Sequence, residues 1–122
     1  MNDIRIKRVY EAAEPDDGYR VLVDRLWPRG ISKERMQMDL WMKDAAPSTA
    51  LRTWFSHDRS KWENFKHRYF LELDAQSEAV KILHEKAAKG RLTLLFAAQD
   101  VECNHAIALR EYLISRSMNQ NK

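Results

Sequence analysis

One short segment constrains the fold more than any other, because its apolar residues stop abruptly at a group of charged and ring-bearing residues. Residues 19–26 contain the unbroken apolar triplet Val21-Leu22-Val23, a pattern typical of a strand buried on both faces. Pro28 cannot donate a backbone hydrogen bond to a sheet, and Gly30 permits a turn that a Cβ would oppose. The pattern therefore predicts a central strand that ends near Leu26. The side chains at its carboxyl end are Asp24, Arg25, Trp27 and Arg29.

The composition is that of one globular domain, which we expect to span residues 1–122 with a frayed polar tail at 117–122. Hydrophobic residues make up 44% of the 122 positions and charged residues 32%. No apolar run approaches the roughly 20 residues of a membrane span, and the first residues lack the apolar core of a signal peptide. Cys103 is the single cysteine, which suits a reducing compartment. We therefore expect a cytoplasmic protein that has no membrane contact.

Strand and helix patterns alternate along the chain. Strands are expected at 4–9, 19–26, 39–44 and 92–98, the first as a half-exposed edge strand and the third as an inner strand. Helices are expected at 33–38, after Ser48, after a Ser60–Glu63 capping box, at 77–89 and at 104–116. The aromatic stripe of the third helix (Trp62, Phe65, Tyr69 and Leu73) is interpreted as core packing. This alternation predicts an α/β layered domain, with a mostly parallel sheet of about four strands flanked by helices.

Polar side chains follow each of the three expected inner strands. In open α/β sheets ligands bind at the carboxyl ends of the strands, which lie along one edge. Separate parts of the chain would therefore deliver their charged groups to a common rim. These groups are Asp24, Arg25 and Arg29; Lys43, Asp44 and Ser48; and Asp100, Asn104 and His105.

The cations among these residues predict an anion site. Arg25 and Arg29 offer planar donors that grip a carboxylate or phosphate at two points. Ser48 would cap a helix whose first amides attract an anion, with Lys43 and Arg52 behind it. Trp27 and Asn104 would form a stacking surface or pocket wall. The alternatives are that Arg25 pairs with Asp24 or Asp44 to tie strand ends together, and that Ser48 simply caps its helix.

Proton transfer at such a site would fall to Asp24, Asp100 or His105. His57-Asp58 is a weaker acid–base pattern, because adjacent side chains seldom face each other. Cys103, near a helix start, could act as a nucleophile. A phosphatase loop, however, needs an arginine after five intervening residues, where this chain has Leu109. No zinc-ligand spacing or glycine-rich loop is present, so we expect neither a metal nor a cofactor.

Three functional hypotheses follow. The first is an enzyme, a hydrolase or transferase that acts on a small phosphate- or carboxylate-bearing substrate. The second is a non-catalytic module that binds nucleic acid or an acidic protein, because the net charge is +3 and the isoelectric point is near 9.1, and such binding would weaken steeply with salt. The third is an internal salt-bridge network without a ligand. A homodimer is compatible with each.

The same segments resemble the YeaO-like proteins, a bacterial family with a domain of unknown function. The longest similar stretch is residues 20–33, Arg-Val-Leu-Val-Asp-Arg-Leu-Trp-Pro-Arg-Gly-Ile-Ser-Lys. The resemblance covers about Gly18 to Leu113, and implies a small cytoplasmic α/β domain without supplying an activity. A histidine is common in this family where the chain has Cys103, which argues against an essential cysteine nucleophile. Further similar motifs are Trp41-x-Lys43-Asp44-x-Ala46-Pro47-Ser48, Leu51-Arg52-x-Trp54-Phe55, Trp62 with Phe65 and Tyr69, and Asn104-x-Ala106.

Overall fold

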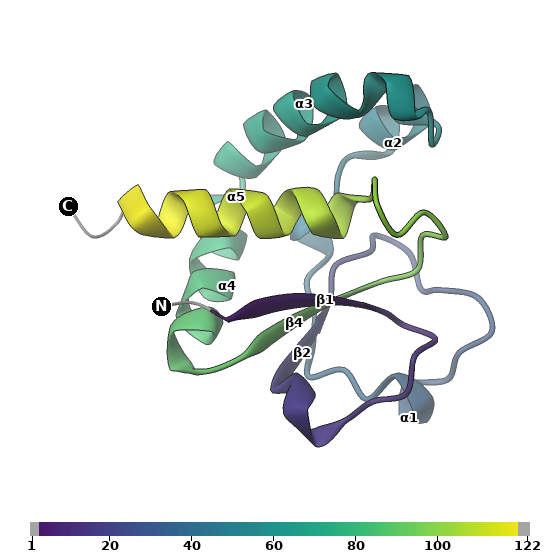
Figure 1. Cartoon of the computed structure of the whole chain (residues 1–122), viewed down its shortest axis with the longest axis vertical. Coiled ribbons are helices and arrows are strands. Elements are labelled where there is room, and N and C mark those ends of the chain that lie inside the picture. Colours follow the sequence, from purple (N-terminus) through teal and green to yellow (C-terminus); the bar gives the residue numbers. More distant parts are fainter. Residues whose placement is uncertain (1–2, 120–122) are drawn as a thin grey trace.

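A four-stranded parallel sheet forms the centre of the molecule (Figure 1). The structure is a computed structural model that describes residues 3–119. The strands lie in the order β1-β4-β2-β3, and every neighbouring pair is parallel. The predicted α/β class and parallel sheet are thus confirmed. The strands are β1 (Ile4–Arg8), β2 (Tyr19–Leu22), β3 (Leu40–Trp41) and β4 (Leu92–Phe96).

Helices cover the two faces of the sheet unequally. Figure 1 shows α4 and α5 against one face with α2 and α3 beyond them, while the short α1 lies on the other side. The helices are α1 (Lys33–Met36), α2 (Thr49–Phe55), α3 (Trp62–Asp74), α4 (Ser77–Lys89) and α5 (His105–Asn119). Three short 3-10 turns are η1 (Pro15–Asp17), η2 (Lys43–Ala45) and η3 (Arg59–Lys61). None of the helices within residues 3–119 is long and apolar enough to cross a membrane.

The sheet residues alternate between two cores. Val21 and Leu94 pack into the larger core beneath α2–α5, while Leu22 and Leu95 pack into a smaller one with Met36 of α1. All four of these strand residues are fully buried. An apolar strand that is buried on both faces is what the runs in β2 and β4 predict, and this prediction is confirmed.

The aromatic stripe of α3 packs into the larger core, as predicted. Phe65, Tyr69 and Leu73 are almost fully buried, and Trp62 packs against them at the surface. The Tyr69 hydroxyl donates a hydrogen bond to the carbonyl of Ala45 in η2. Burial raises the pKa of Tyr69 well above its usual value, so the hydroxyl remains a donor and ties α3 to the chain after β3.

Two strands are shorter than the sequence predicts. Residues 39–44 do not form an inner strand, because β3 has two residues at the edge of the sheet and η2 begins at Lys43. There the backbone N–H of Ala45 bonds the Met42 carbonyl, a turn contact that replaces the sheet ladder. Similarly, β2 ends at Leu22 rather than near Leu26, since the side chain of Asp24 takes over the backbone N–H of Ala97 from the sheet.

The predicted capping box is also wrong. Ser60 does not cap α3, which begins at Trp62 without a side-chain cap. Instead the carboxylate of Asp58 accepts hydrogen bonds from the backbone N–H and the hydroxyl of Ser60, at 3.0 and 2.7 Å. A carboxylate is a stronger acceptor than a hydroxyl, so Asp58 organises the turn η3 ahead of the helix.

The ends of the described chain add two findings. Strand β1 is an edge strand, as predicted, but Lys7 is not a solvated cation, because its ammonium group lies within 3.1 Å of carboxylate oxygens of Glu14 and Asp17. Helix α5 continues through Asn119, so the predicted frayed tail does not begin at residue 117. Its remaining part, residues 120–122, lies outside the described residues.

Candidate functional site

A cavity of about 1240 Å³ lies where β2 and β4 end. Its walls come from the loops that follow these strands, from α2, and from the start of α5. Eight of the ten predicted site residues line it, and Lys43 and Ser48 do not. Those eight are Asp24, Arg25, Trp27, Arg29, Arg52, Asp100, Asn104 and His105.

Asp24 and His105 meet at the bottom of the strand ends. The Nε2 atom of His105 lies 2.8 Å from Oδ1 of Asp24, and each side chain is 15% exposed. The contact is short but poorly directed, so neither atom completes a well-formed hydrogen bond. The other oxygen, Oδ2, accepts from the Ala97 N–H at 3.1 Å. The carboxylate is therefore fixed to β4 and sets the position of the imidazole.

Arg25 is held by backbone carbonyls. Its Nη2 donates to the Ala46 carbonyl at 3.2 Å and its Nε to the Pro47 carbonyl at 3.3 Å. The alternative pairing of this arginine with Asp24 or Asp44 is not observed. The third guanidinium nitrogen, Nη1, has no partner among residues 3–119, so a fixed cation at the cavity keeps donors in reserve.

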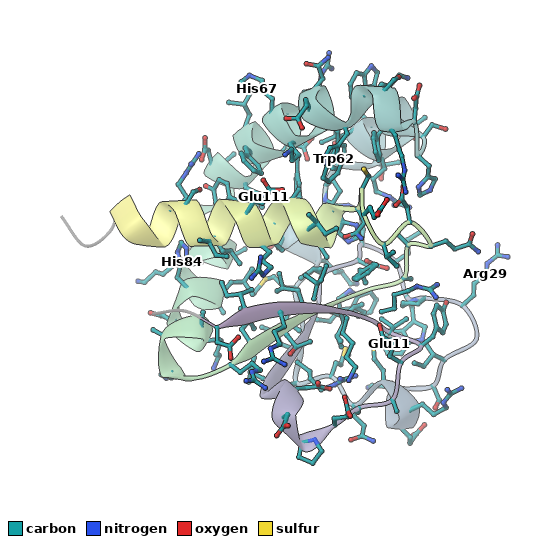
Figure 2. The ribbon with its side chains drawn as sticks, in the orientation of Figure 1. Glu11, Arg29, Trp62, His67, His84 and Glu111 are labelled. Atoms are coloured by element: carbon teal, nitrogen blue, oxygen red, sulfur yellow. The ribbon has the colours of Figure 1, made fainter. Side chains whose placement is uncertain are left out.

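Arg29 and Arg52 are exposed at the cavity. Figure 2 shows Arg29 extending away from the ribbon, while its backbone carbonyl accepts a hydrogen bond from the Tyr10 hydroxyl at 2.7 Å. Neither guanidinium has a side-chain partner in the described part of the chain. These two cations are therefore unneutralised within the structure.

Arg59 is a cavity residue that the sequence analysis missed. Its Nη2 and Nε bond the two carboxylate oxygens of Asp100 at 2.9 and 3.0 Å, and its Nη1 bonds Glu102 at 2.9 Å. Arg59 belongs to a turn between helices, and no local pattern links it to a loop more than forty residues later.

The same contacts correct the predicted role of Asp100. Its Oδ1 also accepts from the backbone N–H groups of Glu102 and Cys103. These backbone bonds, together with Arg59, lower the pKa of Asp100 to about 2. A carboxylate that is so weak a base does not accept a proton near neutral pH. Asp100 organises the loop before α5 instead of transferring protons.

The predicted anion position at Ser48 is filled from within the chain. The Ser48 hydroxyl and backbone N–H donate to the carboxylate of Glu72 at 2.6 and 2.8 Å, and the hydroxyl caps α2 through the Leu51 N–H. Lys43 lies 4.2 Å above the ring of Trp41. An internal carboxylate thus holds the place that the sequence analysis assigned to an external anion.

Asn104 and Trp27 are fixed by hydrogen bonds of their own. Asn104 is almost fully buried and caps α5, with Oδ1 accepting from the Ile107 N–H at 3.0 Å. Trp27 donates from Nε1 to the Ile31 carbonyl at 2.8 Å and packs edge-on against Trp41. Asn104 is therefore a helix cap, whereas Trp27 is a half-exposed wall of the cavity.

The remaining candidates contribute less. Asp58 is directed at Ser60, so His57-Asp58 does not form the acid–base pair considered above. Cys103 is a half-buried free thiol at the cavity wall. Within residues 3–119, no group of three or more histidine, cysteine or acidic side chains is placed to hold a metal ion.

Comparison with known proteins identifies the family. Residues 3–122 match the family described as the inactive DUF488-N3 subclade. The chain is 44% identical over 113 residues to the uncharacterized protein YeaO of Escherichia coli K12, which covers 93% of this chain and 98% of that protein. It is 41% identical over 113 residues to the uncharacterized protein Mb3100c of Mycobacterium bovis, which covers 93% of this chain and 95% of the relative. No solved structure gives a significant match. The chain belongs to the YeaO-like domain-of-unknown-function family, within the inactive DUF488-N3 subclade.

Proposed function

We propose that this chain binds a small anionic ligand in the cavity at the ends of β2 and β4. The observation that supports this most strongly is the excess of cationic side chains. Four arginines line the cavity, against the two carboxylates of Asp24 and Asp100. Both carboxylates are already engaged, by His105 with the Ala97 N–H and by Arg59. The positive charge that remains favours a phosphate or carboxylate.

Arg25 and Arg52 are the expected ligand contacts. The two carbonyl bonds of Arg25 hold its guanidinium in place before a ligand arrives, which reduces the ordering cost of binding. Arg52 projects from α2 with no internal partner among the described residues, so its donors are available. The amino-terminal end of α5, a 15-residue helix, opens beside them at His105 and adds partial positive charge.

Binding without turnover is favoured over catalysis. The subclade that contains this chain is described as inactive, and Asp100 is too weak a base to act near neutral pH. A concave, charge-lined site also suits a small ligand better than nucleic acid, which needs an extended basic surface. A cytoplasmic location is part of the proposal, because Cys103 would remain reduced there, and cell fractionation tests it.

The direct test is titration calorimetry with inorganic phosphate at low ionic strength. Arg25→Gln and Arg52→Gln should each raise the dissociation constant about tenfold or more, because a hydrogen bond to a charged group contributes about 1.5–3 kcal/mol. Arg35→Gln is the matched control, since Arg35 is an exposed arginine on α1, away from the cavity. An absence of binding, or an equal loss in the Arg35→Gln variant, would contradict the proposal.

The Asp24–His105 contact supports a second candidate, a hydrolase or transferase acting on the bound anion. A carboxylate that orients an imidazole is a recurring arrangement in acid–base catalysis, and Nδ1 of His105 has no partner within residues 3–119. The test is release of p-nitrophenol from p-nitrophenyl phosphate across pH 5–9. Turnover that disappears in a His105→Ala variant would favour this candidate, and its absence in the parent chain would favour simple binding.

A further inference from the structure

We infer that the anion bound in this cavity carries an aromatic ring that stacks on Trp27. The inference rests on the proposed anion site and adds the chemical class of the ligand, an aryl phosphate or aromatic carboxylate. Ligand pockets for drug-sized molecules span roughly 300–1,000 Å³. The cavity here, about 1240 Å³, is far larger than an inorganic anion needs, so it has room for an organic group beside the charged one.

Trp27 differs from the other three tryptophans in one respect. Each of the others has a cation over its ring: Lys43 over Trp41 at 4.2 Å, Arg68 over Trp54 at 4.3 Å and Lys66 over Trp62 at 5.4 Å. Among the residues that the structure describes, no cation lies over the ring of Trp27. The indole that lines the cavity is therefore the one whose ring is not already occupied by an internal charge.

The ring of Trp27 is also held rigidly. Its Nε1 donates to the Ile31 carbonyl at 2.8 Å, and its ring centroid lies 5.5 Å from that of Trp41 in an edge-to-face contact. Two independent contacts fix the ring, and part of it remains exposed at the cavity. A preorganised ring stacks on a ligand without loss of side-chain entropy, and such stacking is strong for aromatic partners.

Apolar residues extend this wall on both sides of the indole. Leu26 is 67% exposed, an unusual state for a large apolar side chain, and it lines the cavity together with Pro28. Arg25, whose guanidinium is the fixed cation, is two positions before Trp27 in the same segment. One rim thus offers a charged end and an apolar end, which matches a ligand with an anionic group on a planar body.

The test compares phenyl phosphate with inorganic phosphate by titration calorimetry on the full chain. We expect phenyl phosphate to bind about tenfold more tightly, as stacking of one ring on an aromatic side chain predicts. Trp27→Leu should remove this advantage and leave the affinity for inorganic phosphate within about twofold. Trp54→Leu is the matched control, because Trp54 does not line the cavity, and it should keep the advantage.

The outcomes separate the two proposals. If inorganic phosphate binds and phenyl phosphate binds no more tightly to the parent chain, the aromatic inference is overturned and the anion site stands. If neither ligand binds, the anion site itself is wrong. The comparison on the parent chain needs no variant, so a Trp27→Leu protein that fails to fold does not prevent the decision. If Trp27→Leu folds and retains the full advantage, Trp27 is not the stacking surface.

Discussion

Arg59 and Asp100, 41 residues apart in the sequence, are joined by two hydrogen bonds of 3.0 and 2.9 Å. The bonds connect the turn before α3 to the loop before α5, and both residues line the cavity. The same carboxylate accepts two backbone N–H groups of its own loop. One side of the site is therefore built by an ion pair between two segments that have no regular structure.

The ion pair makes the stability of the chain depend on acidity. The pKa of Asp100 is lowered from 3.8 to about 2, so the folded state favours the ionised carboxylate. Its stabilisation is complete above about pH 4 and is lost as the pH falls through about 2. In urea denaturation, Asp100→Asn should be less stable than the parent at pH 7, with a smaller difference at pH 2.5. A difference that stays constant between these pH values would contradict this. Glu102→Gln, which removes one exposed contact to Arg59, is the control.

Two glycines with similar backbone angles should respond differently to alanine. Gly18 has φ +67° and a Cβ placed there would lie 2.3 Å from the Arg91 carbonyl oxygen, whereas Gly30 has φ +75° and open space around it. The Arg91 carbonyl also accepts from the Tyr19 N–H at 3.0 Å and cannot easily move. Gly30→Ala should lower the free energy of unfolding by about 1 kcal/mol, and Gly18→Ala by about 2–4 kcal/mol. Equal losses in urea denaturation would show that the contact with Arg91 yields freely.

Removal of the Tyr69 hydroxyl should destabilise the chain without creating a large cavity. Tyr69→Phe leaves the Ala45 carbonyl without its side-chain donor in a fully buried position. We expect a loss of about 1–3 kcal/mol in the free energy of unfolding, measured by urea denaturation. Tyr19→Phe is the matched control, since the Tyr19 hydroxyl has no hydrogen-bond partner in the described residues. A loss of the same size in both variants would exclude a specific role for this bond.

Arg20 should be the most sensitive charged residue of the sheet. It is 4% exposed on β2, and its guanidinium bonds the carboxylate of Asp17 and the carbonyls of Met36 and Gln37. Burial alone would raise the pKa of Asp17, but hydrogen bonds from the Glu14 N–H, Lys7 and Arg20 outweigh it and lower the pKa.

Replacement of this arginine by methionine leaves buried acceptors unpaired. Arg20→Met should therefore lower the free energy of unfolding by about 3 kcal/mol, near the low end for a broken buried ion pair because Lys7 still faces Asp17. The measurement is urea denaturation at pH 7. Arg35→Gln, which changes an exposed arginine on α1, should alter stability by less than about 0.5 kcal/mol. A small loss at Arg20 would mean that the site repacks.

The sequence predicts the parts of this fold that depend on local apolar periodicity. The buried runs at Val21 and Leu94 and the stripe at Tyr69 gave β2, β4 and α3, because burial of such patterns leaves few alternatives. The 39–44 strand failed because its competitor is tertiary. The Ala45 carbonyl is taken by Tyr69, 24 residues later, and no local pattern reveals that bond.

The candidate site divides in the same way. The rule that polar residues gather at the carboxyl ends of parallel strands brought Asp24, Arg25 and His105 to one cavity. Arg59 escaped notice because it reaches this cavity from a turn between helices, outside any strand end. Ser48 was assigned to an external anion because its partner, Glu72, comes from the far end of the next helix.

The strand order has a consequence for how the chain is made. β4 lies between β1 and β2, yet it is the last of the four strands to be synthesised. A nascent chain that stops before residue 92 has two strands with no common neighbour, and the larger core lacks Leu94 and all of α5. Such a fragment exposes apolar strand surface to other chains. Completion of the sheet therefore awaits the final part of translation, and shortened products of this chain are natural substrates for chaperones and proteases.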